Sequence, residues 1–130
     1  MVSVIYVVLS AFILCWLTLH VIKHRRKSRI SLGDGDNKDL RAAIAAHSNA
    51  SENIPIALLL LVILEYNGGN IWMVHFLGVS LVVGRLLHAR GLLTSKFKGR
   101  VIGMQITVLM ILGVAIANLV YLPYDKLLAL

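Results

Sequence analysis

Four long apolar stretches fill most of this chain, and they restrict its fold more than any other feature. They cover roughly residues 2–22, 40–65, 71–92 and 100–122. Each is long enough to cross a bilayer core of about 30 Å, which needs about 20 helical residues. Each crossing must be helical, because lipid offers no partner to an unpaired backbone group. Since 58% of the 130 residues are hydrophobic, we expect one all-α integral membrane domain over residues 1–130, folded as a bundle of four transmembrane helices.

The first apolar stretch is predicted to be a retained transmembrane helix rather than a cleaved signal peptide. No basic segment stands ahead of "MVSVIYVVLSAFILCWLTLHVI", and the run is long enough to span; the dense positive charge follows it instead. Cys15 lies inside this run and is the only cysteine, so no intramolecular disulfide is predicted.

The positive charge predicts how the chain is oriented. Lys and Arg gather in residues 23–41 and 90–100, whereas residues 66–70 have neither and the C-terminal tail has only Lys126. The positive-inside rule then places both basic connections in the cytoplasm and both termini in the periplasm. The net charge of +7 therefore suits anionic lipid head groups better than nucleic acid. An aromatic belt is expected at the outer surface, formed by Tyr66, Trp72, Tyr121 and Tyr124.

The connections also contain turn and capping signals. In "GDGDNKD", Asp36 or Asn37 suits the N-cap of the second helix, and Asp39 would lie in its first turn. The segment lacks the twelve-residue spacing and terminal glutamate of a calcium loop, so no metal site is predicted. "NGGN", residues 67–70, predicts a tight turn between the second and third helices.

Several polar side chains fall where a transmembrane helix should be apolar. Arg41, Asn49 and Glu52 share one helix face at spacings of eight and three residues, and Arg85 and His88 share a face of the third helix. At 1.5 Å per residue, Glu52 lies roughly 16 Å beyond Arg41, and Arg85 roughly 10 Å from the same surface. We therefore expect Asn49, Glu52 and Arg85 to meet in one polar layer in the cytoplasmic half, with Arg100 near its mouth.

Three interpretations of this layer are open. Glu52 and Arg85 could pair as a purely structural cluster. The layer could instead hold an anionic small molecule, or it could belong to a proton or ion path.

The motifs resemble those of a known family. "HSNASENIP" on the second helix, "VVGRLLHARG" on the third and a basic residue opening the fourth resemble the MAPEG family, the membrane-associated proteins of eicosanoid and glutathione metabolism. The resemblance spans nearly the whole chain and is strongest to the small bacterial inner-membrane branch.

That resemblance implies a homotrimer in the inner membrane, with glutathione as a cosubstrate held between subunits near the cytosolic side. Asn49, Glu52 and Arg85 match family residues that contact glutathione, and His88 matches a position with histidine or tyrosine. Arg100 matches the arginine that stabilises the thiolate, and Arg41 is a candidate substitute for a family arginine. The implied activity is conjugation of glutathione to lipophilic electrophiles, or reduction of peroxides.

The chain departs from the family pattern at four positions. Ala45 stands where the family often has arginine, and Leu92, Val101 and Met104 replace tyrosine, serine and tyrosine of catalytic members. The alternative expectation is therefore a non-catalytic membrane scaffold of the same fold that binds another anionic or lipid ligand.

Overall fold

The computed structural model describes residues 1–129 and is entirely helical apart from its turns. The four long helices are α1 (Ser3–Ser28), α2 (Lys38–Tyr66), α3 (Ile71–Leu93) and α4 (Phe97–Val120), and a short α5 (Tyr124–Leu128) follows. Each of the first four is long and apolar enough to cross a membrane. The expected four-helix membrane fold is thus observed.

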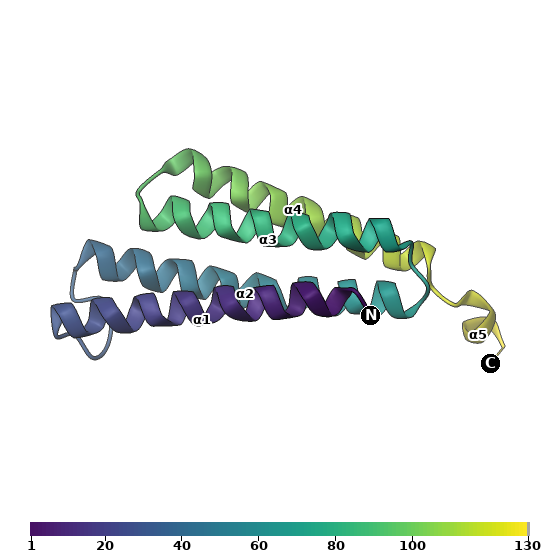
Figure 1. Ribbon diagram of the computed structural model, residues 1–130, viewed down its shortest axis with the longest axis horizontal. Coiled ribbons are helices and arrows are strands. Elements are labelled where there is room, and N and C mark those ends of the chain that lie inside the picture. Colours follow the sequence, from purple (N-terminus) through teal and green to yellow (C-terminus); the bar gives the residue numbers. More distant parts are fainter. Residues whose placement is uncertain (130) are drawn as a thin grey trace.

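The helices form two antiparallel hairpins that pack against each other (Figure 1). The α1–α2 and α3–α4 connections lie at one end, which we call the basic end because it carries residues 23–41 and 90–100. The N-terminus, the α2–α3 turn and α5 lie at the other end (Figure 1). Within residues 1–129, α1 packs on α2 and α3 but not on α4, whereas α2 contacts all three other long helices.

The helices extend beyond their apolar stretches at the basic end. Helix α1 continues through the basic run to Ser28 instead of ending near residue 22, and α4 begins at Phe97 rather than near residue 100. Lysine and arginine are good helix formers, so the hydrogen-bonded backbone continues into water after the hydrocarbon-compatible part has ended. Arg29 ends α1 in the left-handed conformation, with φ of 54°.

The predicted capping and turn signals are confirmed. Asn37 is the N-cap of α2, and its side chain accepts a hydrogen bond from the Leu40 amide at 3.0 Å. Residues 67–70 form the short α2–α3 turn, in which Gly68 has φ of 82°, and Asn70 accepts from the Trp72 amide at 2.9 Å. Helix α2 runs without interruption through Pro55.

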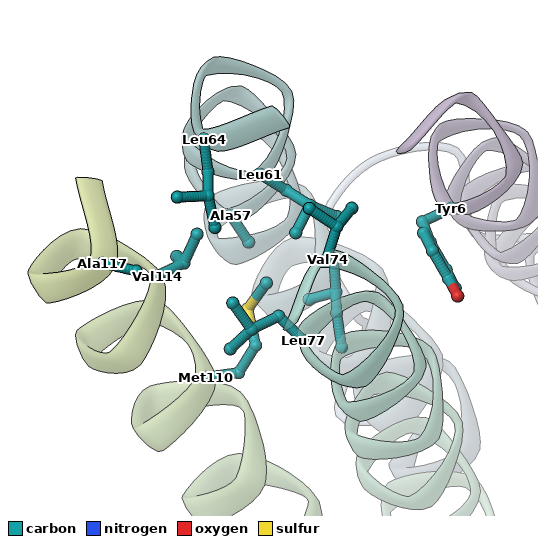
Figure 2. Close-up of a cluster of buried hydrophobic side chains, with 10 residues drawn as sticks. Tyr6, Ala57, Leu61, Leu64, Val74, Leu77, Met110, Val114 and Ala117 are labelled. Carbon is teal, nitrogen blue, oxygen red and sulfur yellow. The ribbon is translucent and has the colours of Figure 1, made fainter. Parts of the chain in front are cut away.

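A hydrophobic cluster fills the end of the bundle opposite the basic end. Figure 2 shows side chains of α2, α3 and α4 meeting there. Its labelled members are Ala57, Leu61, Leu64, Val74, Leu77, Met110, Val114, Ala117 and, from α1, Tyr6. The Tyr6 hydroxyl lies 2.7 Å from Nδ1 of His75 on α3, which joins α1 to this end of the core.

The N-terminus of α1 is held by a side chain from another helix. Glu65, near the end of α2, accepts hydrogen bonds from the amides of Val2 and Ser3 at 2.6 and 2.8 Å. The N-cap residue of α1 has no side-chain cap of its own. The carboxylate therefore satisfies amides that a helix N-terminus leaves unpaired, and its charge also suits the positive end of the helix dipole.

Glycines bring α3 and α4 into backbone contact. A methyl group added to Gly103 would collide with the backbone of His88 and Gly84, and one added to Gly91 would collide with the backbone of Arg100. Such close approach is typical of membrane helices that pack through small residues. It places the start of α4, and with it Arg100, directly beside the end of α3.

Candidate functional site

Arg85 is the centre of a buried polar cluster in the half of the bundle nearer the basic end. Its side chain is 1% exposed. Nε donates to Oγ1 of Thr107 at 2.9 Å, Nη1 donates to Oδ1 of Asn49 at 2.5 Å, and Nη2 lies 3.6 Å from Sδ of Met104. The Thr107 hydroxyl in turn donates to the Gly103 carbonyl at 2.9 Å. The cluster thus joins α2, α3 and α4 through one guanidinium group.

No carboxylate compensates this guanidinium within the described chain. Over residues 1–129, the only ion pairs are those of Arg41 with Asp34 and Asp36, at 2.8 and 3.3 Å. Asn49 meets Arg85 as the depth argument predicted, but Glu52 does not pair with it. Glu52 is exposed on α2. The structural alternative of a Glu52–Arg85 ion pair is therefore absent from the protomer.

Glu52 instead lines a small cavity beside the cluster. This cavity has a volume of about 230 Å³ and lies where α2, α3 and α4 meet. Four of the predicted site residues line it together: Asn49, Glu52, His88 and Arg100. One acid, one amide, one imidazole and one guanidinium therefore face the same space.

A larger, open cavity of about 890 Å³ adjoins the first and shares Asn49, His88 and Arg100 with it. The remainder of its wall comes from α4. That wall is formed by Phe97, Val101, Met104, Gln105, Val108 and Leu109. The combined space is thus polar at the basic end and apolar along α4.

Two predicted site residues lie outside the cavity walls. Arg85 lies behind Asn49 and Met104, so it contacts these two lining residues and not the cavity itself, and its positive charge lies close to the cavity wall. Arg41 is held by Asp34 and Asp36 in the α1–α2 connection and lines neither cavity. The turn-rich loop brings both aspartates to Arg41, and sequence spacing along α2 does not show this.

The structure adds Thr107 and Gln105 to the site, and it places Met104 against Arg85. Met104 and Thr107 follow Arg100 by four and seven residues, so all three lie on one side of α4. That spacing, together with a polar Gln105 inside an apolar helix, could have indicated from the sequence which side of α4 faces the site.

All four positions that depart from the family pattern line the cavities. Ala45 and Leu92 contribute to the smaller cavity, and Val101 and Met104 contribute to the larger. Among residues 1–129, no group of three His, Cys, Asp or Glu side chains is arranged to hold a metal ion.

Comparison with known proteins decides the family. The model of the MAPEG family matches residues 3–120. The chain belongs to the MAPEG family. The inner membrane protein YecN of Escherichia coli strain K12 is 41% identical over 130 residues, which is 100% of this chain and 99% of that protein. YecN of E. coli O6:H1 strain CFT073 matches with the same values.

The MAPEG resemblance predicted from the motifs is therefore confirmed. The four apolar helices and the inner-membrane relative together identify the chain as a multi-pass inner-membrane protein of the MAPEG family.

Proposed function

We propose that this MAPEG protein binds glutathione in the joined cavities and transfers its thiolate to lipophilic electrophiles. The observation that carries the proposal is the buried Arg85 guanidinium, which has no carboxylate partner among residues 1–129. An uncompensated charge inside a membrane protein costs several kcal/mol, so such groups usually face a partner or a bound ion. An anionic ligand beside Asn49 would offset that cost.

The side chains around the smaller cavity suit the charges of glutathione. Glutathione has two carboxylates and one ammonium group. Glu52 is the acid in this cavity and would accept the ammonium, whereas Arg100 and the charge of Arg85 behind Asn49 favour the carboxylates. His88, which is 4% exposed, adds a hydrogen-bonding group at the contact between the two cavities.

Arg100 would also favour the reactive form of the thiol. A guanidinium near sulfur stabilises the thiolate, which is the nucleophile, and the thiol proton passes to water. In conjugation with an aryl halide, a carbon–sulfur bond forms and the carbon–halogen bond breaks with release of halide. In peroxide reduction, two glutathione molecules become one disulfide while the peroxide becomes an alcohol and water. The apolar wall of α4 would hold the lipophilic partner in either reaction.

The proposal includes a homotrimer with both termini in the periplasm and the basic end in the cytoplasm. Glu52 is exposed on the protomer surface at membrane depth. A carboxylate facing lipid is unfavourable, and coverage by a neighbouring subunit would remove that contact. The basic residues of both hairpin connections support the orientation.

Ligand binding and turnover require separate tests. Detergent-purified protein should be stabilised against thermal unfolding by millimolar glutathione and also by S-methylglutathione, which keeps the charges but cannot form a thiolate. Arg100→Gln should abolish conjugation of glutathione to an aryl halide, while Arg26→Gln, at an exposed position of α1, serves as the charge-matched control. If neither glutathione nor S-methylglutathione raises the unfolding temperature, the proposal is refuted.

A non-catalytic scaffold for another anionic or lipid ligand is the second candidate. Val101 and Met104 favour it, because they place apolar side chains in the cavity where catalytic members carry hydroxyl groups. Under this alternative Glu52→Ala breaks the trimer, whereas the transferase proposal expects an intact trimer without activity. Size-exclusion chromatography with light scattering distinguishes the two.

A further inference from the structure

The α3–α4 turn forms a further hollow at the basic end. It has a volume of about 310 Å³ and shares no lining residue with the two cavities of the proposed glutathione site. Its wall is formed by Leu87, Arg90, Gly91, Thr94, Lys96, Lys98 and Gly99. Three cationic side chains and no acidic one therefore surround the same small space.

These three cations have no acidic partner of their own. Arg90, Lys96 and Lys98 are exposed, and they take part in none of the ion pairs found over residues 1–129. Neither α3 nor α4 contains an aspartate or glutamate. In the other connection at this end, Asp34 and Asp36 are already paired with Arg41. No ion pair within residues 1–129 thus neutralises the positive charge of the hollow.

The backbone at the hollow also favours an anion. Helix α4 begins here, its N-cap Lys96 provides no side-chain hydrogen bond, and its first turn has no acidic residue. The first amides of a helix have no partner within the helix, and its dipole is positive at this end. Lys98 and Gly99, which belong to this first turn, line the hollow themselves. The glycine contact between α3 and α4 keeps the turn compact, so both sides of the hollow stay close together.

The surface next to the hollow is apolar and faces outward. Val83 and Leu87 precede Arg90 on the same side of α3, and both are exposed. Ile102, one turn after Lys98 on α4, is exposed as well. An anion bound at the hollow would therefore lie where basic side chains give way to a lipid-facing surface. This arrangement matches a lipid whose head group is negative and whose chains extend along α3 and α4.

We propose that the hollow at the α3–α4 turn binds the phosphodiester head group of an anionic phospholipid from the leaflet at the basic end. Arg90, Lys96 and Lys98 contact the phosphate oxygens, and Val83, Leu87 and Ile102 contact the acyl chains. The site is independent of the proposed glutathione function, because no residue is shared. It would tie the α3–α4 turn, which directly precedes Phe97 and Arg100 of α4, to the membrane surface.

The test compares lipids that have the same acyl chains but an anionic or a zwitterionic head group. Native mass spectrometry of the detergent-purified protein counts bound lipid during titration with dioleoyl phosphatidylglycerol or dioleoyl phosphatidylcholine. We expect selective binding of phosphatidylglycerol, and an affinity about tenfold lower or worse for Lys96→Gln/Lys98→Gln, because each basic residue near an anionic surface contributes substantially. Lys23→Gln/Lys27→Gln removes the same charge from the end of α1 and should change the affinity less than about twofold if the hollow is the site.

Two further variants guard against a folding defect. Lys96→Arg/Lys98→Arg keeps the charge and should restore binding, and Arg90→Gln alone should weaken it if the double glutamine variant does not fold. Equal affinity for phosphatidylcholine would overturn the proposal, as would equal losses in the two double glutamine variants. Complete competition by millimolar inorganic phosphate would also overturn it, because the occupant would then be free phosphate rather than a lipid.

Discussion

Replacing Thr107 with valine removes one hydroxyl group from beside Arg85 while leaving the side-chain volume nearly unchanged. In the native protein, Oγ1 of Thr107 accepts from Nε of Arg85 at 2.9 Å and donates to the Gly103 carbonyl at 2.9 Å. Thr107 is 0% exposed and Arg85 1% exposed, so bulk water does not reach the place of the lost acceptor. The substitution therefore leaves a charged donor unsatisfied in a buried position.

The expected cost follows from the kind of hydrogen bond that is lost. Hydrogen bonds to charged groups contribute about 1.5–3 kcal/mol in soluble proteins. Side-chain hydrogen bonds within membrane proteins average about 0.6 kcal/mol and reach about 1.7 kcal/mol. Because the lost acceptor binds a charged guanidinium, we expect Thr107→Val to lower the free energy of unfolding by about 1.5 kcal/mol, near the upper value for hydrogen bonds in membrane proteins.

The measurement is reversible unfolding in mixed detergent micelles, followed by far-ultraviolet circular dichroism. Thr18→Val is the matched control, since its hydroxyl donates only to the Leu14 carbonyl, at 2.9 Å, on the exposed side of α1. We expect that control to change stability by less than about 0.5 kcal/mol. In an Arg85→Met background, Thr107→Val should lose most of its effect. Equal costs for Thr107→Val and Thr18→Val, or full additivity with Arg85→Met, would refute the reasoning.

Three other substitutions test the packing, the capping and the loop. Gly103→Ala should destabilise the protein by about 1–3 kcal/mol in the same unfolding assay, because its methyl group collides with the backbone of α3. Gly113→Ala is the control: its methyl group would meet only the Leu77 side chain, at an ordinary 3.6 Å, so stability should be unchanged or slightly higher. Glu65→Ala should cost about 1 kcal/mol by uncapping α1, and hydrogen exchange should become faster at the first amides of that helix. The hydrogen bond from Arg41 holds the pKa of Asp34 below its ordinary 3.8. The ionised Asp34 therefore stabilises the folded protein fully above pH 3.8, and this stabilisation is lost as the pH falls through the folded-state pKa. Arg41→Gln should reduce this pH dependence, as measured by unfolding between about pH 2 and 5, and the hydrogen bond from the Asp36 amide should preserve the remainder.

The sequence predicted the fold closely, because each relevant signal is local. Apolar length and the exclusion of unpaired backbone from lipid require four helices. Asn37 and residues 67–70 act through neighbours a few positions away, so capping and turn chemistry placed the start of α2 and the turn before α3 correctly. The larger errors fell at the basic side, at the end of α1 and the start of α4, since apolar length measures the lipid-soluble part of a helix and not its hydrogen bonding; α4 also ends two residues earlier than expected, at Val120.

The site was predicted less completely, because it depends on how each helix is rotated about its axis. Asn49 and Glu52 differ by about 60° around α2, which the sequence cannot resolve into inside and outside. In the structure, the buried side of α2 passes through Ala46, Ala50 and Ile54. Asn49 lies at the edge of that side and reaches Arg85, whereas Glu52 lies away from it and is exposed.

The sequence by itself determined that this is a four-span helical membrane protein, and that polar groups of α2, α3 and α4 share one depth in the half near the basic end. Depth follows from counting residues along a helix of known rise. Only the tertiary structure decided that Arg85 is satisfied by Asn49 and Thr107, and that Arg41 is held by the aspartates of its loop. Those choices depend on contacts between helices and on the path of a loop, and both are set by packing that no single segment contains.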